Sequence, residues 1–278
     1  MNNTFAEEIR NAVAEALEDK VVEVREVEKT NGVMYTGISI RTEGCNIAPT
    51  IYLNEDKSVE ENVQAVLVAY AQHQPKGEID VSWVREYEQV KDKLAVMLTS
   101  KPINGLAKRK APGFDDLYMH AYIVVDGGSV IGMGNIKVKQ EMLKTWGITS
   151  AKLFADALKS APSVKPAKLQ GMFDTLSEMG SPLEMPAEFD GNDPMSVLTN
   201  NTSVYGAAAI LYTTVKENTY MIPSSVHEVI LVSGEMIESN GIPLNMFIDD
   251  VNRTCLKPED YLSNHAYRFN GKKWENVA

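Results

Sequence analysis

The stretch Val21-Val-Glu-Val-Arg-Glu-Val-Glu-Lys-Thr-Asn-Gly-Val-Met-Tyr-Thr-Gly-Ile-Ser-Ile40 decides the fold class. Its first seven residues alternate between apolar and charged side chains, which is the pattern of a half-buried strand. Asn31-Gly32 is a strong hairpin signal, because both residues tolerate the positive φ of a tight turn. Met34 to Ile40 is the returning strand, so the sequence predicts an antiparallel β-hairpin.

Helical patterns lie on both sides of this hairpin. Apolar residues recur at helical spacing after Thr4 and again after Ser58, so each of these two residues is expected to cap an amphipathic helix. A similar stripe from Trp83 to Met97 predicts a third helix, whereas the apolar run from Leu117 to Val125 predicts a buried strand. The mixture predicts an α/β (α+β) fold, with antiparallel or mixed sheets flanked by helices.

The last third of the chain returns to strand patterns. Ala207 to Thr213 and Val229 to Val232 are predicted strands, with an interruption at Pro223-Ser-Ser225 between them. Tyr267 to Trp274 contains Asn270-Gly271 and predicts a terminal hairpin. Upstream, Trp146 ends an apolar helical pattern just before Gly147, so we expect its indole to be largely buried.

One segment differs from the rest in composition. Residues 162–194 hold five prolines and show no apolar period, so they are predicted to form a Pro-rich linker or surface excursion. This segment separates an N-terminal α/β part, residues 1–161, from a C-terminal α/β part, residues 195–278. We expect these two parts to pack as one unit.

Composition narrows the class of protein. The 278 residues carry 27 Lys and Arg against 38 Asp and Glu, a net charge of −11. Direct nucleic-acid binding is therefore not expected, because phosphate contacts need clustered cations. No run approaches the roughly 18 apolar residues of a membrane span, and residues 1–20 lack a signal-peptide pattern. Cys45 and Cys255 show no metal spacing, which indicates a cytoplasmic protein with free thiols and no metal or other cofactor.

Two motifs that resemble functional sites have simpler explanations. The glycine-rich stretch Asp126 to Gly134 follows a predicted strand, as a phosphate loop would. It lacks the third glycine of a dinucleotide fingerprint and a Gly-Lys-Ser/Thr sequence, so a hairpin turn is the better interpretation. Asp116 and His120 are four residues apart, but His120 is predicted to enter a strand, which would separate the two side chains.

The sequence Ser224-Ser225-Val-His227-Glu228 holds every side-chain type of a nucleophilic triad. Triad members normally come from separate elements, so this closeness argues against a triad, and a capped turn explains the same residues. We retain Ser224, Ser225, His227 and Glu228 as candidate binding residues and assign no catalytic residue.

A carboxylate that pairs with His227 is expected from another segment. In a strand, Ser225 and His227 would share one face, and Glu228 would point to the other. Asp249 and Asp250 are the nearest acidic candidates in sequence.

Four blocks of sequence together resemble one known family. They are Asn31–Gly37 with Pro49–Leu53, Gly134–Val138 with Met142–Ile148, Gly206–Tyr212 with Ile222–Leu231, and Asp250–Thr254 with Pro258–Ser263. The chain resembles a large bacterial family of unknown function that is common in gut bacteria and often carried on their mobile elements. The resemblance spans about residues 31 to 268. It implies no activity, cofactor or catalytic residue.

Three hypotheses for the function remain open. The first is a non-enzymatic protein-binding or accessory protein, which the resemblance would connect with a bacterial mobile element. The second is a hydrolase-type enzyme centred on His227 and Glu228. The third is an acidic inhibitor that mimics nucleic acid. A pocket that holds His227 and a carboxylate distant in sequence would favour the enzyme. A contiguous acidic ridge would favour the inhibitor, and an exposed apolar patch would favour the binding protein. The sequence makes no prediction about oligomeric state.

Overall fold

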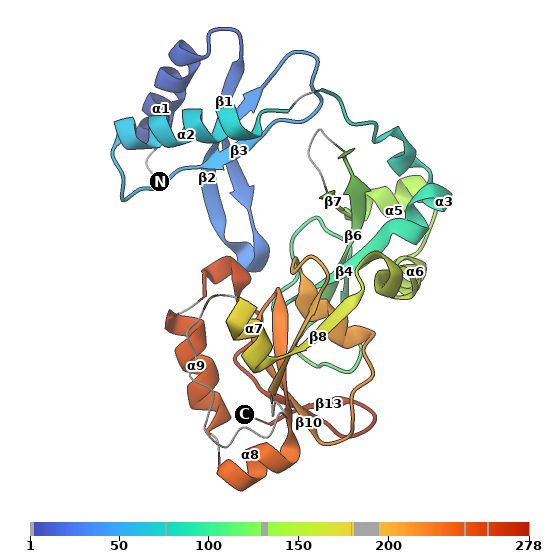
Figure 1. Ribbon diagram of the computed structural model, residues 1–278. Helices are drawn as coiled ribbons and strands as arrows, with labels where there is room; N and C mark the ends of the chain where they lie inside the picture. Colours follow the sequence, from blue (N-terminus) through green and yellow to red (C-terminus); the bar gives the residue numbers. More distant parts are fainter. Residues whose placement is uncertain are drawn as a thin grey trace. The chain divides into compact units, whose positions relative to one another are not determined.

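The computed structural model describes residues 3–75, 77–128, 133–178, 180, 195–241, 243–254 and 256–277 (Figure 1). The fold is mixed α+β with three antiparallel sheets, which confirms the predicted fold class. Contacts divide the chain into two compact units. Unit 1 is Met1–Trp83 with Val125–Gly134, and unit 2 is Val84–Val124 with Asn135–Ala278. The boundaries between the units lie after Trp83, Val124 and Gly134.

Unit 1 contains a three-stranded sheet of order β1-β2-β3 with two helices on one face (Figure 1). The predicted hairpin is confirmed, because Val22 pairs with Ile40, and Asn31 and Gly32 have φ values of 64° and 74° in the turn. The elements are α1 Asn3–Ala16, β1 Val21–Glu28, η1 Thr30–Gly32, β2 Met34–Arg41, β3 Thr50–Tyr52 and α2 Val59–His73.

The core of unit 1 lies between this sheet and its helices. Ile9 of α1 and Val66 of α2 are buried against Ile38 and Ile40 of β2. Ser58 caps α2 as predicted, and its hydroxyl accepts a hydrogen bond from the backbone N–H three residues later in a complete capping box. The amphipathic helices therefore form where their apolar stripes meet the apolar face of the hairpin.

Unit 2 begins with a second sheet, in which β4 Leu94–Thr99 and β5 Lys108–Lys110 flank β6 Tyr118–Asp126, and β7 Met133–Lys137 also pairs with β6. The helix predicted over Trp83 to Met97 is wrong. Its last four residues, Leu94 to Met97, belong to β4, and every residue of β4 is buried. A short apolar run fits both helical and strand spacing, and pairing with β6 decides in favour of the strand. The part before Leu94 contains η2 Ser82–Arg85, α3 Tyr87–Val90 and η3 Lys91–Lys93.

The larger sheet of unit 2 has the strand order β13-β12-β10-β11-β9-β8. Helices α8 and α9 cover one face, where Ile237, Leu244 and Ile248 pack on Ile222 and Val232 (Figure 1). Helix η4 contacts β9 and β11. The strands are β8 Ala167–Gly171, β9 Met195–Asn200, β10 Thr219–Ser225, β11 Glu228–Ser233, β12 Tyr267–Phe269 and β13 Trp274–Asn276. The helices are α5 Gln140–Trp146, α6 Ser150–Val164, α7 Met172–Glu178, η4 Gly206–Leu211, α8 Gly234–Asn240, α9 Leu244–Thr254 and η5 Pro258–Asp260.

Two predictions in the last third need correction. The stretch from Ala207 to Thr213 is not a strand, because its first five residues belong to η4, where small buried alanines let the backbone approach β9 and β11 closely. Pro223-Ser-Ser225 does not interrupt β10. The strand passes through it with a register shift between Pro223 and Ser225, a β-bulge that accommodates the proline. The terminal hairpin around Asn270-Gly271 is confirmed.

The Pro-rich segment is described only in part. Residues 162–178 contain the end of α6, β8 and α7, whereas residues 181–194 lie outside the described residues, as does Cys255. Trp146 is partly buried. Its ring packs 5.4 Å from that of Tyr87, and its Nε1 donates to the Val84 carbonyl at 2.9 Å. Cys45 is a free thiol, as predicted.

Candidate functional site

His227 lies in the turn between β10 and β11 and contacts three separate segments. Its Nδ1 accepts a hydrogen bond from the backbone N–H of Tyr205 at 3.2 Å, and its Nε2 lies 3.2 Å from Oδ1 of Asp260 in η5. The Tyr205 ring stacks on the imidazole with centroids 5.9 Å apart and planes 15° apart. The backbone carbonyl of His227 accepts from Oγ1 of Thr199 at 2.8 Å. The residue therefore joins the β10–β11 turn to β9, to the start of η4 and to η5.

These bonds assign the tautomer of His227. A backbone N–H can only donate, so Nδ1 accepts, and the proton of the neutral ring lies on Nε2 and is donated to Asp260. A neutral imidazole has one acceptor nitrogen, and here the Tyr205 amide occupies it. A general base needs that lone pair for the substrate proton or the nucleophile. In this arrangement His227 is a connector between segments.

The other predicted site residues separate into two pairs. The Ser225 hydroxyl accepts from the backbone N–H of His227 at 3.0 Å, and the Ser224 hydroxyl donates to Glu228 at 3.1 Å. The expectation that Glu228 does not orient His227 therefore agrees with the geometry. The carboxylate does come from another segment, but it is Asp260, so Asp249 and Asp250 were the wrong choice.

Sequence reasoning missed Asp260 and Tyr205. Asp260 belongs to the Pro258–Ser263 block of the family resemblance, and Tyr205 directly precedes the Gly206–Tyr212 block. Both segments meet His227, which lies in the Ile222–Leu231 part of the third block. Two of the four blocks thus converge at one partly buried junction, and this convergence was the available signal.

The loop that leads to Tyr205 has unusual backbone geometry. Ser203 and Tyr205 have φ values of 55° and 56°, a left-handed conformation that is uncommon for a bulky residue. The side chain of Asn200 braces the loop, because its Oδ1 accepts from Thr202 and its Nδ2 donates to the Val204 carbonyl. Such strain persists where surrounding contacts over-determine it, and here the contacts to His227 do so.

A buried lysine continues this network. Lys165, only 3% exposed, donates from Nζ to Oγ1 of Thr202 at 2.8 Å and forms no ion pair with a described carboxylate. Burial lowers the pKa of Lys165. Its backbone carbonyl accepts from the Tyr212 hydroxyl at 2.8 Å, and burial raises the pKa of Tyr212 to about 12. This polar cluster fixes the end of α6 to the loop after β9.

The Tyr122 hydroxyl is buried and has no hydrogen-bond partner among the described residues. Tyr122→Phe is therefore expected to leave the free energy of unfolding unchanged or to raise it by about 1 kcal/mol, since the hydroxyl is desolvated without compensation. Tyr267→Phe is the matched control, because that hydroxyl bonds to Asp116 and Ser263. The free energy of unfolding of Tyr267→Phe should fall by about 2 kcal/mol. Urea unfolding measures both, and equal losses would contradict the assignment.

The motif of Asp116 and His120 does not form a site. Asp116 accepts from the Tyr267 hydroxyl at 2.7 Å, whereas His120 is fully buried in β6 and bonds to the backbone of Ile103 and Ala107. His120 does lie in a strand, as predicted, and this separates it from Asp116. Asp116 and His120 each form hydrogen bonds that join a strand to a loop.

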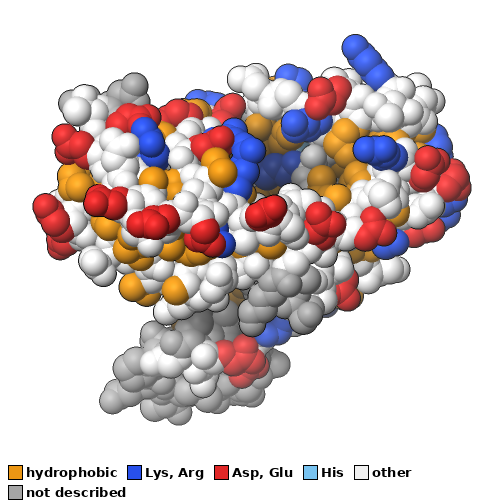
Figure 2. All heavy atoms as spheres, turned by 90° about the horizontal axis from the view of Figure 1, so that it is seen from above, with side chains coloured by type: hydrophobic (Ala, Val, Ile, Leu, Met, Phe, Trp, Pro, Cys, Tyr) orange, Lys and Arg blue, Asp and Glu red, His pale blue; other side chains and the backbone are white. Residues whose placement is uncertain are grey.

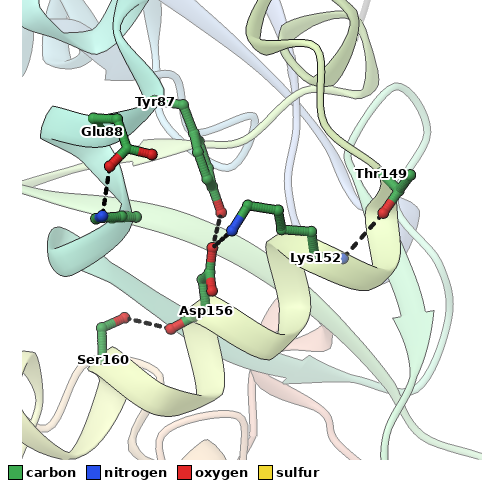
Figure 3. Close-up of polar contacts among 7 residues, drawn as sticks. Tyr87, Glu88, Thr149, Lys152, Asp156 and Ser160 are labelled. Atoms are coloured by element: carbon green, nitrogen blue, oxygen red, sulfur yellow. Dashed lines mark hydrogen bonds and ion pairs between the residues drawn. The ribbon is translucent and has the colours of Figure 1, made fainter.

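A polar groove of about 530 Å³ runs along α6 beside Lys91. At its wall, the Tyr87 hydroxyl and the Lys152 ammonium both point at the carboxylate of Asp156, at 2.6 and 2.9 Å (Figure 3). Burial alone would raise the pKa of Asp156, but these two hydrogen bonds outweigh it, and the pKa is lowered. Asp156 therefore pairs with Lys152, and Lys91 pairs with Glu88 outside the lining, so two of the three lysines that line the groove are in ion pairs.

Two less polar hollows lie elsewhere on unit 2 and share one wall. The first, of about 340 Å³, opens beside Leu169 and Leu231, and the second, of about 430 Å³, beside Phe269 and Trp274. Residues 213–215 line both hollows. The linings contain Lys216, Lys272 and Lys273 but no Asp or Glu.

The acidic residues concentrate in the other unit. The first 83 residues carry seven Lys and Arg and 15 Asp and Glu, so they hold −8 of the net charge of −11. Glu7 and Glu23 pair with arginines. In Figure 2, Asp and Glu side chains lie among uncharged, hydrophobic and basic ones.

The described residues contain no group of three His, Cys, Asp or Glu side chains that could hold a metal ion. In the part of the chain that the structure describes, no helix is long and apolar enough to cross a membrane. No match was found among curated proteins or among solved structures. A family model described as "Family of unknown function (DUF5688)" matches residues 2–271, so the chain belongs to that family.

Proposed function

We propose that this chain is a non-enzymatic protein-binding protein whose partner inserts apolar side chains into the two hollows of unit 2. The observation that carries the proposal is the wall that both hollows share, residues 213–215. Interfaces place aliphatic and aromatic anchors in such adjacent depressions and surround them with a polar rim. The threonines and serines of the linings supply that rim. The family resemblance extends the proposal to an accessory role for a bacterial mobile element.

The charge of the hollows specifies the partner. Three lysines and no acidic residue line them, in a chain whose net charge is −11. A local excess of positive charge on an acidic protein attracts negative groups. The partner is therefore a protein segment with apolar anchors next to Asp or Glu residues.

The arrangement around His227 supports this proposal over the hydrolase. Its two ring nitrogens both bond within the protein, to Tyr205 and Asp260, and Glu228 bonds to Ser224. A net charge of −11 over 278 residues is dilute and likewise offers little support for mimicry of nucleic acid.

A random peptide library displayed on phage tests the proposal without a known partner. Thr214 is exposed and lines both hollows, so the indole of Thr214→Trp would fill them. Thr145→Trp on the exposed face of α5 is the matched control. Selected peptides should combine apolar residues with Asp or Glu, bind the parent and Thr145→Trp equally, and lose at least about tenfold in affinity, or 1.4 kcal/mol, with Thr214→Trp. Absence of selected binders, or binders indifferent to Thr214→Trp, would overturn the proposal.

A further inference from the structure

His227 is a titratable residue whose hydrogen bonds fit only one of its two charge states. Its Nδ1 accepts from the Tyr205 N–H at 3.2 Å, and its Nε2 lies 3.2 Å from Oδ1 of Asp260. A protonated imidazole carries a hydrogen on both nitrogens and accepts at neither. Protonation would therefore turn Nδ1 into a donor that faces another donor. At the same time it would strengthen the bond from Nε2 to the Asp260 carboxylate.

The groups around the imidazole come from four elements. Helix η5 contributes the Asp260 carboxylate, and Glu259 precedes it in the same turn. The loop before η4 contributes the Tyr205 ring, which stacks on the imidazole. Strand β11 begins with Glu228, whose carboxylate bonds to a serine of β10, and β9 contributes the uncharged Thr199. Asp260 thus favours the charged ring, and the Tyr205 amide opposes it. The side chain is 37% exposed, so solvent protons reach it.

The backbone around His227 is anchored independently of its ring. The His227 carbonyl accepts from Oγ1 of Thr199 at 2.8 Å, and the Val226 N–H donates to the Asp260 carbonyl at 2.8 Å. Neither bond depends on the proton, so the turn stays fixed to β9 and η5. Tyr205 is the side that gives way, because it holds a left-handed φ of 56° and protonation removes a bond that keeps it there.

Helix η4 connects Tyr205 to the hollows of the proposed binding site. Tyr205 directly precedes η4, and the last two residues of the helix, Ile210 and Leu211, line the second hollow. Residues 213–215, the wall that both hollows share, follow one residue later. The Thr213 hydroxyl donates to a carbonyl inside η4 at 2.8 Å and fixes the wall to the helix. A packed helix of this kind carries a shift at one end to the other.

We infer that a proton on His227 opens its bond to Tyr205, shifts η4 and weakens partner binding at the two hollows. Histidine is the side chain whose charge ordinarily changes between about pH 5 and 8, so the partner is released as the medium is acidified through this range. Only the last step, weaker binding, rests on the proposed function. The first step, loss of the Tyr205 bond, is measured without a partner.

Nuclear magnetic resonance of the whole chain tests the first step. Between about pH 7.5 and 5.5, the protection of the Tyr205 amide against hydrogen exchange, corrected for the intrinsic rate, should fall at least about tenfold. This fall should follow the titration of the His227 ring nitrogens. A Tyr205 amide whose protection stays constant while the ring titrates would overturn the inference, and this measurement needs no variant.

Two variants assign the effect to His227. His227→Asn keeps an acceptor oxygen near the position of Nδ1 but does not titrate, so protection of its Tyr205 amide should not change with pH. It retains His120, so it also controls for acid effects elsewhere in the unit. Asp260→Asn removes the charge that favours the protonated ring and should move the midpoint of the Tyr205 response to lower pH. A midpoint that Asp260→Asn leaves in place would count against the assignment.

Peptides selected in the test of the proposed function examine the last step. Their Kd for the parent should rise at least about fivefold between about pH 7.5 and 5.5, and their Kd for His227→Asn should stay within about twofold. An equal rise for both proteins would refute coupling through η4. If no peptide is selected, the last step fails together with the proposed function, and the Tyr205 measurement still decides the first.

Discussion

Gly206→Ala should cost unit 2 at least about 3 kcal/mol of unfolding free energy and should abolish its folding at 37 °C if the unit is marginally stable. A Cβ atom at this position would lie 2.0 Å from Oγ1 of Thr199, 2.3 Å from the His227 carbonyl and 2.8 Å from the backbone N of Asn200. Two of these three atoms are backbone, so a rotamer change cannot relieve the overlap. The shift would also break the bond from Thr199 to the His227 carbonyl.

The measurement is urea unfolding in a Trp83→Phe background, where Trp146 and Trp274 report on unit 2 alone. Gly105→Ala is the control. Gly105 lies in the same unit with a φ of 73°, and no atom lies within 4 Å of the added carbon. Its substitution should therefore lower the free energy of unfolding by about 1 to 2 kcal/mol through backbone strain alone. If Gly206→Ala lost no more than this control, close packing at the His227 junction would be refuted.

The second large effect is a loss of stability in acid that originates at His120. Its Nε2 accepts from the Ile103 N–H at 3.2 Å, so its Nδ1 carries the proton and donates to the Ala107 carbonyl at 2.9 Å. Burial lowers the pKa of His120 to about 4, and the charges of Lys108 and Lys137 act in the same direction. The folded protein therefore holds this histidine neutral, against an ordinary value near 6.5 in the unfolded chain.

The direction of the pH effect follows from proton binding. Between pH 6.5 and 4 the unfolded chain binds a proton at His120 that the folded chain does not, so stability falls as the pH falls. The stabilisation is complete above pH 6.5, and about 3 kcal/mol of it is lost by pH 4. His120→Gln supplies a donor and an acceptor but does not titrate. Its stability should fall by about 2 to 3 kcal/mol less than that of the parent between pH 7 and 4.5. Parallel pH curves for the two proteins would show that His120 is not the origin.

Short-range chemistry explains which elements could be predicted. The turn at Asn31-Gly32, the cap at Ser58 and the left-handed stop at Gly147 formed where expected, whereas Thr4, the other expected cap, lies inside α1. Each depends on contacts within about four residues, so the sequence of a single segment contains the whole interaction. The mixed fold class followed from these local signals, because caps and turns divided the apolar patterns into helices and strands.

Elements whose identity depends on distant partners were mispredicted. The stripe that ends in Leu94 to Met97 suited a helix, and only pairing with β6 made it a strand. The alanines after Gly206 suited a strand, and only close packing on β9 and β11 made them η4. In both cases the intrinsic preference of a residue for helix or strand contributes about a few tenths of a kcal/mol. The free energy gained by burying the apolar side chains of the segment is larger and decides the structure.

The sequence alone determined that His227 is a polar residue in a turn, that a serine lies near it in sequence, and that the Glu228 carboxylate points to the opposite face. It could not determine that Asp260, 33 positions away, reaches Nε2 while the Tyr205 amide, 22 positions away, occupies Nδ1. Hydrogen bonds of this kind are directional over about 3 Å, and chain segments approach that closely only after the sheet has set their positions. The same holds for β8, whose residues resemble any short polar strand. Only the pairing of one side with β9 leaves Leu169 facing outward at an edge.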